Sequence, residues 1–121
     1  TSVLATHRRD GAPQMSYVTA GVDGDGRVVV STRETAMKTK NLRRDPRASL
    51  FAMDDAFRAA VQVDGTAEIV SLPDAMEPLV EYYRRISGEH PDWDEYRRAM
   101  QDQRRVLVRI TVERAGPDAW G

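Results

Sequence analysis

The sequence of 121 residues contains no cysteine. This absence excludes disulfides, thiolate metal sites and cysteine nucleophiles, and it suits a reducing cytoplasm. Long apolar runs are also missing, because none approaches the roughly 20 residues that a membrane span needs, and no signal-peptide pattern appears. We therefore expect a cytoplasmic protein without a membrane partner.

The chain also lacks an excess of charge of either sign. It has 18 basic and 19 acidic residues, which gives a formal net charge of -1. Proteins dedicated to nucleic acids or to membrane surfaces usually carry a marked basic excess. We therefore expect no nucleic-acid partner, and local clusters of charge are more informative than the sum.

Motifs for metal binding and for side-chain catalysis are missing too. The two histidines, His7 and His90, have no metal-ligand spacing, and we expect them at the surface or in capping positions. The stretch 23–26, Asp-Gly-Asp-Gly, lacks the other ligands of a calcium loop and predicts a hairpin turn instead. No serine or threonine stands in a nucleophile elbow. We expect no metal site and no covalent catalysis by a side chain.

The sequence does contain a basic stretch, residues 31–47, directly after the strand-like run 28–30. Thr35 is expected to cap a helix that Pro46 ends. Six basic residues fall in this stretch: Arg33, Lys38, Lys40, Arg43, Arg44 and Arg47. Hydroxyl groups, free helix amides and an ammonium at one helix start predict a phosphate seat. Its expected members are Ser31, Thr32, Lys38 and Asn41. The alternative is a solvated helix whose arginines pair with nearby acids.

Turn signals and hydrophobic periods predict the remaining elements. Strands are expected over residues 2–7, 13–22, 27–32, 48–53, from 57 or 58 to 70, and 106–112. The long strand should bend at Asp64-Gly65, where glycine permits a bulge. Helices are expected from Pro73 to about residue 86 and over 91–103. This many meandering strands favours a closed antiparallel barrel, because closure removes exposed edges.

The residues also carry a family pattern. The run 38–49, KTKNLRRDPRAS, resembles the signature of the pyridoxamine 5'-phosphate oxidase-like split-barrel flavoproteins, in particular their actinobacterial F420-dependent branch. Further agreement lies in Val3–Thr6, Asp10-Gly11, Pro13-Gln14, Gly65–Ala67, and Gly88 through Arg97. The resemblance implies a mainly β fold with peripheral helices, a split β-barrel of the FMN-binding type with antiparallel Greek-key topology. We expect a single domain over residues 1–121, with an N-terminal helix before residue 1.

The resemblance further implies a homodimer with two coenzyme sites at the subunit interface. Each site would hold the deazaflavin coenzyme F420, or FMN less tightly, and hydride would pass from the reduced ring to a tetrapyrrole, a quinone or an unsaturated carbonyl compound. The cofactor-binding residues would be Gln14, Ser16, Tyr17, Val18, Ser31, Thr32, Met37, Lys38, Lys40 and Asn41, with Phe57 and Arg58 of the other subunit. Two alternatives stay open: an FMN-dependent pyridoxamine-phosphate-oxidase-like enzyme, and a non-catalytic carrier of F420 or flavin.

Two positions depart from the family pattern. Ala36 stands where relatives often carry an arginine, so we expect Arg33 or Lys40 to supply that charge. Tyr17 stands where a smaller polar residue is frequent and would reshape the substrate side of the site. Three further arginines, Arg43, Arg44 and Arg47, either meet the glutamate tail of the coenzyme or face the solvent.

Overall fold

The computed structural model of the chain describes residues 2–54 and 59–116. Its elements, in chain order, are β1 (Ser2–His7), β2 (Pro13–Val18), β3 (Ala20–Val22), β4 (Val28–Arg33), α1 (Met37–Arg44), β5 (Arg47–Met53), β6 (Ala60–Val70), α2 (Met76–Ser87), α3 (Trp93–Asp102) and β7 (Arg105–Gly116). The expected mainly β chain with peripheral helices is confirmed. None of the helices in these residues has the length and apolar character needed to cross a membrane.

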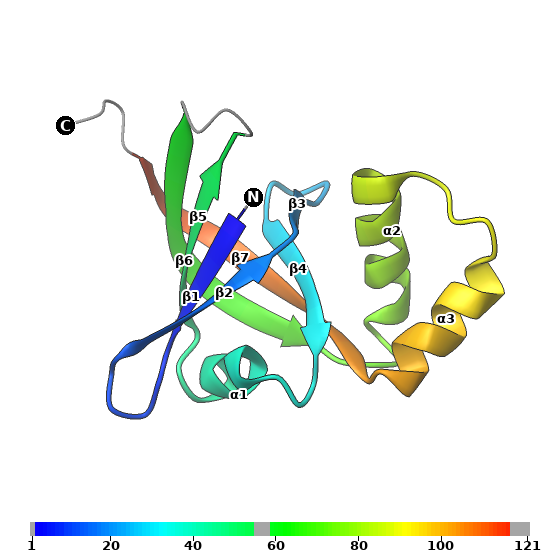
Figure 1. Cartoon of the computed structure of the whole chain (residues 1–121), viewed down its shortest axis with the longest axis horizontal. Helices are drawn as coiled ribbons and strands as arrows, with labels where there is room; N and C mark the ends of the chain where they lie inside the picture. Colours follow the sequence, from blue (N-terminus) through cyan, green and yellow to red (C-terminus); the bar gives the residue numbers. More distant parts are fainter. Residues whose placement is uncertain (1, 55–58, 117–121) are drawn as a thin grey trace.

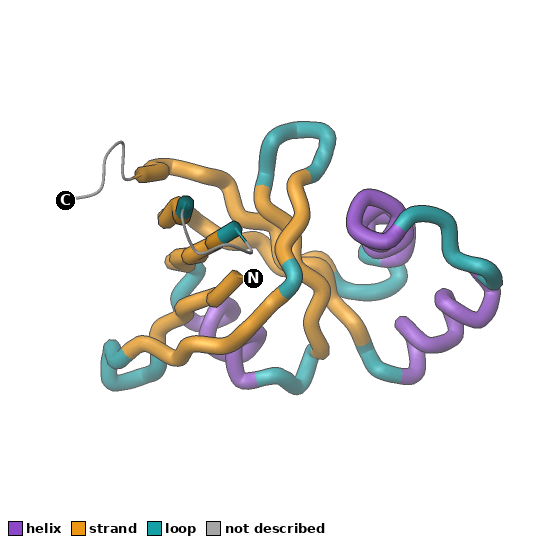
Figure 2. Tube along the Cα trace, turned by 45° about the horizontal axis from the view of Figure 1, so that its top comes forward, coloured by secondary structure: helices purple, strands orange, loops and turns teal. Residues whose placement is uncertain are grey.

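The seven strands form one antiparallel sheet in the order β2-β1-β5-β6-β7-β4-β3. Strands β5, β6 and β7 follow one another as neighbours, and β4 lies beside β7, which is the expected Greek-key arrangement. The sheet curls strongly (Figures 1 and 2), so the result is a half-barrel instead of the closed barrel that the meander favoured. Its edge strands, β2 and β3, follow each other in the chain with only Thr19 between them, because the expected strand 13–22 breaks there.

The bend in β6 is where the sequence predicts it. The pairing of β6 with β7 shifts register between Asp64 and Gly65. A Cβ at Gly65 would lie 2.1 Å from the backbone oxygen of Thr111, so no other residue fits without moving the strand. The bulge therefore lets one long strand follow the curl of the sheet.

The starts of the helices differ in how they are capped. Helix α3 begins at Trp93, two residues after the expected start, and Asp92 caps it, since its Oδ1 accepts a hydrogen bond from the Glu95 amide at 3.1 Å. Helix α1 does not, because its N-cap residue is Ala36 and no side chain caps it, so the prediction of Thr35 as the cap is wrong. Helix α2 starts at Met76, after a turn that contains Pro73, and not at Pro73 itself.

Two apolar clusters hold the fold together. One fills the half-barrel around Leu4, Val30, Leu50 and Ile110. The other packs helices α2 and α3 onto the opposite face of β4 and β7, and it contains Leu79, Val80, Tyr96, Met100 and Leu107. Figure 1 shows α2 and α3 beside the half-barrel, outside it, and α1 below the sheet. The strand β4 is thus shared between the two clusters, and its end lies between the half-barrel and the helices.

Candidate functional site

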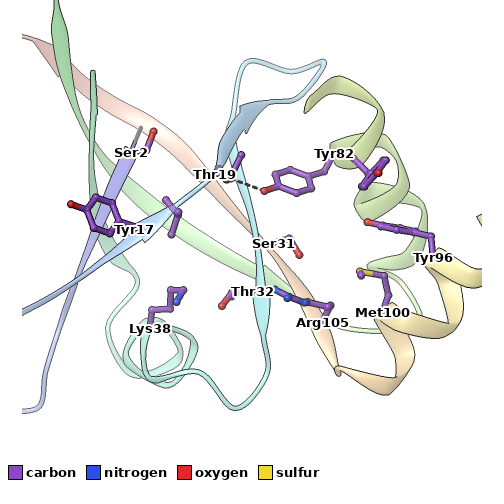
Figure 3. Close-up of a pocket in the computed structure, with 12 residues that line it drawn as sticks. Ser2, Tyr17, Thr19, Ser31, Thr32, Lys38, Tyr82, Tyr96, Met100 and Arg105 are labelled. Carbon is purple, nitrogen blue, oxygen red and sulfur yellow. Dashed lines mark hydrogen bonds between the residues drawn. The ribbon is translucent and has the colours of Figure 1, made fainter. Parts of the chain in front are cut away.

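A cavity of about 740 Å³ lies where β2, β4 and the start of α1 meet helices α2 and α3. Twelve residues line it: Ser2, Tyr17, Val18, Thr19, Ser31, Thr32, Lys38, Tyr82, Tyr83, Tyr96, Met100 and Arg105 (Figure 3). Its volume is in the range of pockets that take a cofactor or a drug-sized ligand. The cations and the hydroxyls of Ser31 and Thr32 come from β4, α1 and β7, and most of the aromatic residues come from the helices.

The end of β4 and the start of α1 form the polar side of the cavity. Thr32 is 3% exposed and Ser31 is half-buried, and both line the cavity. Helix α1 begins four residues after Arg33, and no side-chain oxygen occupies its N-terminal amides. Lys38, the second residue of this helix, points into the same cavity (Figure 3). Amide, hydroxyl and ammonium donors thus meet at a helix start, which is a suitable arrangement for a phosphate.

The cavity contains a second cation, Arg105, the first residue of β7. In the strand register Arg105 lies opposite Arg33 of β4, so two like charges face each other across the pair. Burial lowers the pKa of the Lys38 ammonium, and the charge of Arg105 lowers that pKa further. Burial also lowers the pKa of Arg105, as does the charge of Arg33. Among residues 2–54 and 59–116, no carboxylate forms an ion pair with Lys38 or Arg105.

Tyrosines form the wall opposite the polar side. The Tyr82 hydroxyl donates to the Thr19 carbonyl at 2.6 Å, and the Tyr96 hydroxyl donates to the Leu79 carbonyl at 2.8 Å. Burial raises the pKa of both hydroxyls, that of Tyr96 to about 12. Both groups are therefore neutral near pH 7. Because their protons are engaged, they offer the cavity aromatic surface more than hydrogen-bond donors.

Five of the expected cofactor residues line this cavity: Tyr17, Val18, Ser31, Thr32 and Lys38. The structure brings them together from β2, β4 and α1, as a shared site requires. Met37 is 58% exposed at the helix start, and Lys40 is exposed on the same helix, but neither lines the cavity. Phe57 and Arg58 lie outside the described residues.

Asn41 lies apart from Lys38 although both belong to α1. It is 2% exposed, and its Nδ2 donates to the Thr6 hydroxyl of β1 at 3.1 Å. Its Oδ1 accepts from the Arg44 guanidinium at 3.2 Å. In this structure Asn41 holds the helix against β1 and does not line the cavity.

Two residues of β2 also face the inside of the half-barrel. Gln14 accepts a hydrogen bond from Thr6 Oγ1 at 3.3 Å. Ser16 is more unusual, because its Oγ is buried and has no hydrogen-bond partner within the described part of the chain. A buried hydroxyl without a partner is rare in proteins, so a group that hydrogen-bonds to it would be stabilised there. Neither residue lines the cavity itself.

The sequence did not point to the aromatic wall or to Arg105. We expected the last strand from residue 106, but β7 begins at Arg105, and the register with β4 brings this residue to the cavity. The expected substitutes for the missing arginine at position 36, Arg33 and Lys40, do not line it. The paired basic residues Arg104-Arg105 at the start of the strand were the only local signal.

The three arginines near the end of α1 all have partners. Arg43 contacts Glu34 at 2.6 Å and also donates to Ser71 Oγ at 3.0 Å. Arg47 pairs with Asp45 at 2.6 Å and holds the pKa of that carboxyl well below its usual range. Arg44 donates to the His7 carbonyl at 2.6 Å. For this part of the basic stretch, the structure supports the interpretation that the arginines pair with neighbouring protein groups.

The residues around the cavity fit a phosphorylated flavin-type group. Two cations that have no acidic partner in the described part of the chain, two hydroxyl residues and an uncapped helix start provide for a phosphate. Aromatic and apolar side chains occupy most of the remaining surface, as in most cofactor pockets.

Comparison with known proteins agrees with this geometry. Residues 1–117 match the pyridoxamine 5'-phosphate oxidase family. A conserved hypothetical protein from Mycobacterium tuberculosis is 33% identical, with a TM-score of 0.76, over 94% of this chain and 73% of that protein. An F420 reductase is 21% identical, with a TM-score of 0.72, over 95% of this chain and 87% of the reductase.

A third similar structure is a pyridoxamine 5'-phosphate oxidase-related, FMN-binding protein from Nostoc punctiforme. It is 16% identical, with a TM-score of 0.68, over 94% of this chain and 71% of that protein. At such low identity the last two structures establish the split-barrel fold alone. The resemblance to the pyridoxamine 5'-phosphate oxidase-like proteins is confirmed by the match over residues 1–117, and the chain belongs to the pyridoxamine 5'-phosphate oxidase family.

Proposed function

We propose that this protein is an F420-dependent oxidoreductase of the cytoplasm that binds its coenzyme in the cavity described above. The observation that carries the proposal is the phosphate seat, where Lys38 lies beside Ser31 and Thr32 without a carboxylate partner in the described residues. The family membership and the likeness to an F420 reductase support a flavin-type redox role. The cysteine-free sequence suits a reducing compartment.

In this proposal the chain contributes binding and orientation. When bound, reduced F420 supplies the hydride for an organic acceptor such as a tetrapyrrole, a quinone or an unsaturated carbonyl compound. Lys38 and the hydroxyls of Ser31 and Thr32 hold the phosphate, and Tyr17 and Val18 border the side of the cavity toward the ring. No side chain has to form a covalent bond, which agrees with the absence of a recognisable nucleophile in the sequence.

We also propose that the protein is a homodimer whose second subunit covers the outer face of β2, β1 and β5. On this face Tyr17 lies opposite Val3, which lies opposite Phe51. Tyr17 is 82% exposed and the neighbouring Met15 is 64% exposed, so the single chain leaves a contiguous apolar surface in water. Because Tyr17 also borders the cavity, a second subunit on this face would close the site on that side.

Light scattering after gel filtration tests the dimer. We expect twice the mass of the single chain, and a mass near that of the monomer for Phe51→Lys. Ile86→Lys is the matched control, because Ile86 is similarly exposed at 37% but lies on α2. A wild-type protein with the mass of one chain would contradict the dimer.

Coenzyme titrations test the proposed function. We expect F420 to bind at micromolar or lower concentration, measured by quenching of deazaflavin fluorescence, and to bind more tightly than FMN. Tighter binding of FMN than of F420 would support the FMN-dependent alternative. Binding of neither coenzyme would contradict the proposal. Anaerobic addition of acceptors to bound reduced F420 then separates an enzyme from a carrier, because only an enzyme reoxidises the coenzyme.

A further inference from the structure

Arg105 is a charged group of the cavity with most of its hydrogen-bonding capacity unused among the described residues. Its Nε donates to Gln103 Oε1 at 2.8 Å, and its other guanidinium nitrogens make no hydrogen bond among the described residues. The side chain is half-buried, and it lies across from Arg33 of the neighbouring strand. A half-buried guanidinium beside another cation is unfavourable unless an anion joins it. The fork of free N–H groups suits a carboxylate or a phosphate.

The position of Arg105 separates it from the expected ring side of the cavity. In Figure 3 Tyr17 lies at one end, Tyr96 and Met100 lie at the other, and Lys38 and Thr32 lie between them. Arg105 is placed between Thr32 and Met100, on the side of Lys38 that is away from Tyr17. A ligand with its ring near Tyr17 and its phosphate at Lys38 would reach Arg105 only with a group that continues beyond the phosphate.

The two candidate coenzymes differ in this respect. The phosphate of FMN is a terminal monoester, so the molecule ends there. The phosphate of F420 is a diester, and its second arm continues into a chain that carries carboxylates. Arginine pairs with carboxylates in a bidentate manner, so an acidic arm is the ligand chemistry that Arg105 would recognise.

We propose that Arg105, with the wall formed by Tyr82, Tyr96 and Met100, is the subsite for the acidic arm beyond the phosphate, and that it makes the cavity select F420 over FMN. This inference rests on the proposed function. It assigns the arm to the cavity and not to the basic end of α1, where Arg43, Arg44 and Arg47 are already bonded to the protein. Arg105 is a specificity residue in this account, and Lys38 serves both coenzymes.

The test measures the dissociation constants of F420 and FMN for the wild type and for Arg105→Gln. We expect F420 binding to weaken roughly 10-fold to 100-fold in the variant, because hydrogen bonds to a charged group are lost. FMN binding should change less than about twofold, since no part of FMN reaches Arg105. Arg105→Lys retains the charge without the fork and should lie between the wild type and the glutamine variant for F420.

Two control variants make the result specific. Lys38→Gln should weaken both coenzymes, and Arg43→Gln should weaken neither, because Arg43 is paired with Glu34 outside the cavity. Thermal unfolding of each variant reports whether it is folded. If Arg105→Gln does not fold, the affinities for F420 and FMN are compared between the wild type and Arg105→Lys.

Equal losses for F420 and FMN would overturn the inference, because Arg105 would then hold the shared phosphate. Unchanged affinity for both would overturn it as well. Failure of the proposed function looks different, since the wild type itself would then not bind F420.

Discussion

Two groups of cations in this protein, one at the end of α1 and one in the cavity, differ in their surroundings. At the end of α1, Arg43 and Arg47 form ion pairs with Glu34 and Asp45. In the cavity, Lys38 and Arg105 have no such partner among the described residues, although both are partly buried. Paired arginines on a solvated surface contribute little to stability, whereas partly buried cations without a partner are stabilised when an anion binds beside them.

The number of basic residues in a stretch therefore does not locate a ligand-binding site. Five of the six basic residues in 31–47 lie outside the cavity and are exposed, and one cation of the site, Arg105, comes from the last strand. Whether a charged side chain has a partner, and how far it is buried, indicates better whether it binds a ligand. Such perturbed groups in a cleft are candidates for a functional site because structural charges are normally satisfied.

The strongest test of this comparison is removal of Lys38. We expect Lys38→Ala to weaken F420 binding by roughly 1.5–3 kcal/mol, or roughly 10-fold to 150-fold, through loss of a charge-assisted bond. Arg47→Ala should leave the affinity within about twofold, since Arg47 is 69% exposed and paired with Asp45. Fluorescence titration measures both. Equal effects of the two substitutions would remove the distinction between the two groups.

A second test separates Lys38 from Asn41 within α1. Because Asn41 is buried and bonded to Thr6, Asn41→Ala should lower the free energy of unfolding by roughly 1–3 kcal/mol. Its F420 affinity should stay near that of the wild type under conditions where it is folded. Urea unfolding and fluorescence titration give the two quantities. A large loss of F420 affinity at an unchanged free energy of unfolding would show that Asn41 contributes to phosphate binding.

The smallest effects are expected in the protein without a ligand. Lys38→Gln removes one of two neighbouring cations, so it should raise the free energy of unfolding by about 0.2–0.5 kcal/mol after allowance for solvent screening. Arg43→Gln should lower it by a similar amount, because it breaks the pair with Glu34. Thermal unfolding at low ionic strength compares the two variants. The opposite signs are the informative result, and the same sign for both would show that the cavity cations are not in mutual repulsion.

Much of the fold could be predicted because its signals are local. The Asp-Gly turns, the alternation of the strands and the glycine at position 65 each act over a few residues, and the hairpins and the bulge appear where expected. Helix α3 starts at Trp93 and is capped by Asp92, a residue type that commonly caps helices. The open curl of the sheet was not visible, because closure depends on how strands far apart in the chain meet.

The site was predicted in part for the same reason. Ser31, Thr32 and Lys38 are close in sequence, so a turn and a helix start suffice to bring them together. Arg105 reaches them only through the register of β7 with β4, and the tyrosine wall only through the packing of α2 and α3. Asn41 follows Lys38 by three residues but meets β1, and the direction in which a short helix packs is decided by tertiary contacts.

A crystal structure of the protein with F420 would show where the coenzyme phosphate binds. We expect the phosphate within hydrogen-bond distance of Lys38 and of the hydroxyls of Ser31 and Thr32, with the acidic arm of the coenzyme against Arg105. A phosphate bound at Arg43 or Arg47, or anywhere outside the cavity, would contradict this expectation.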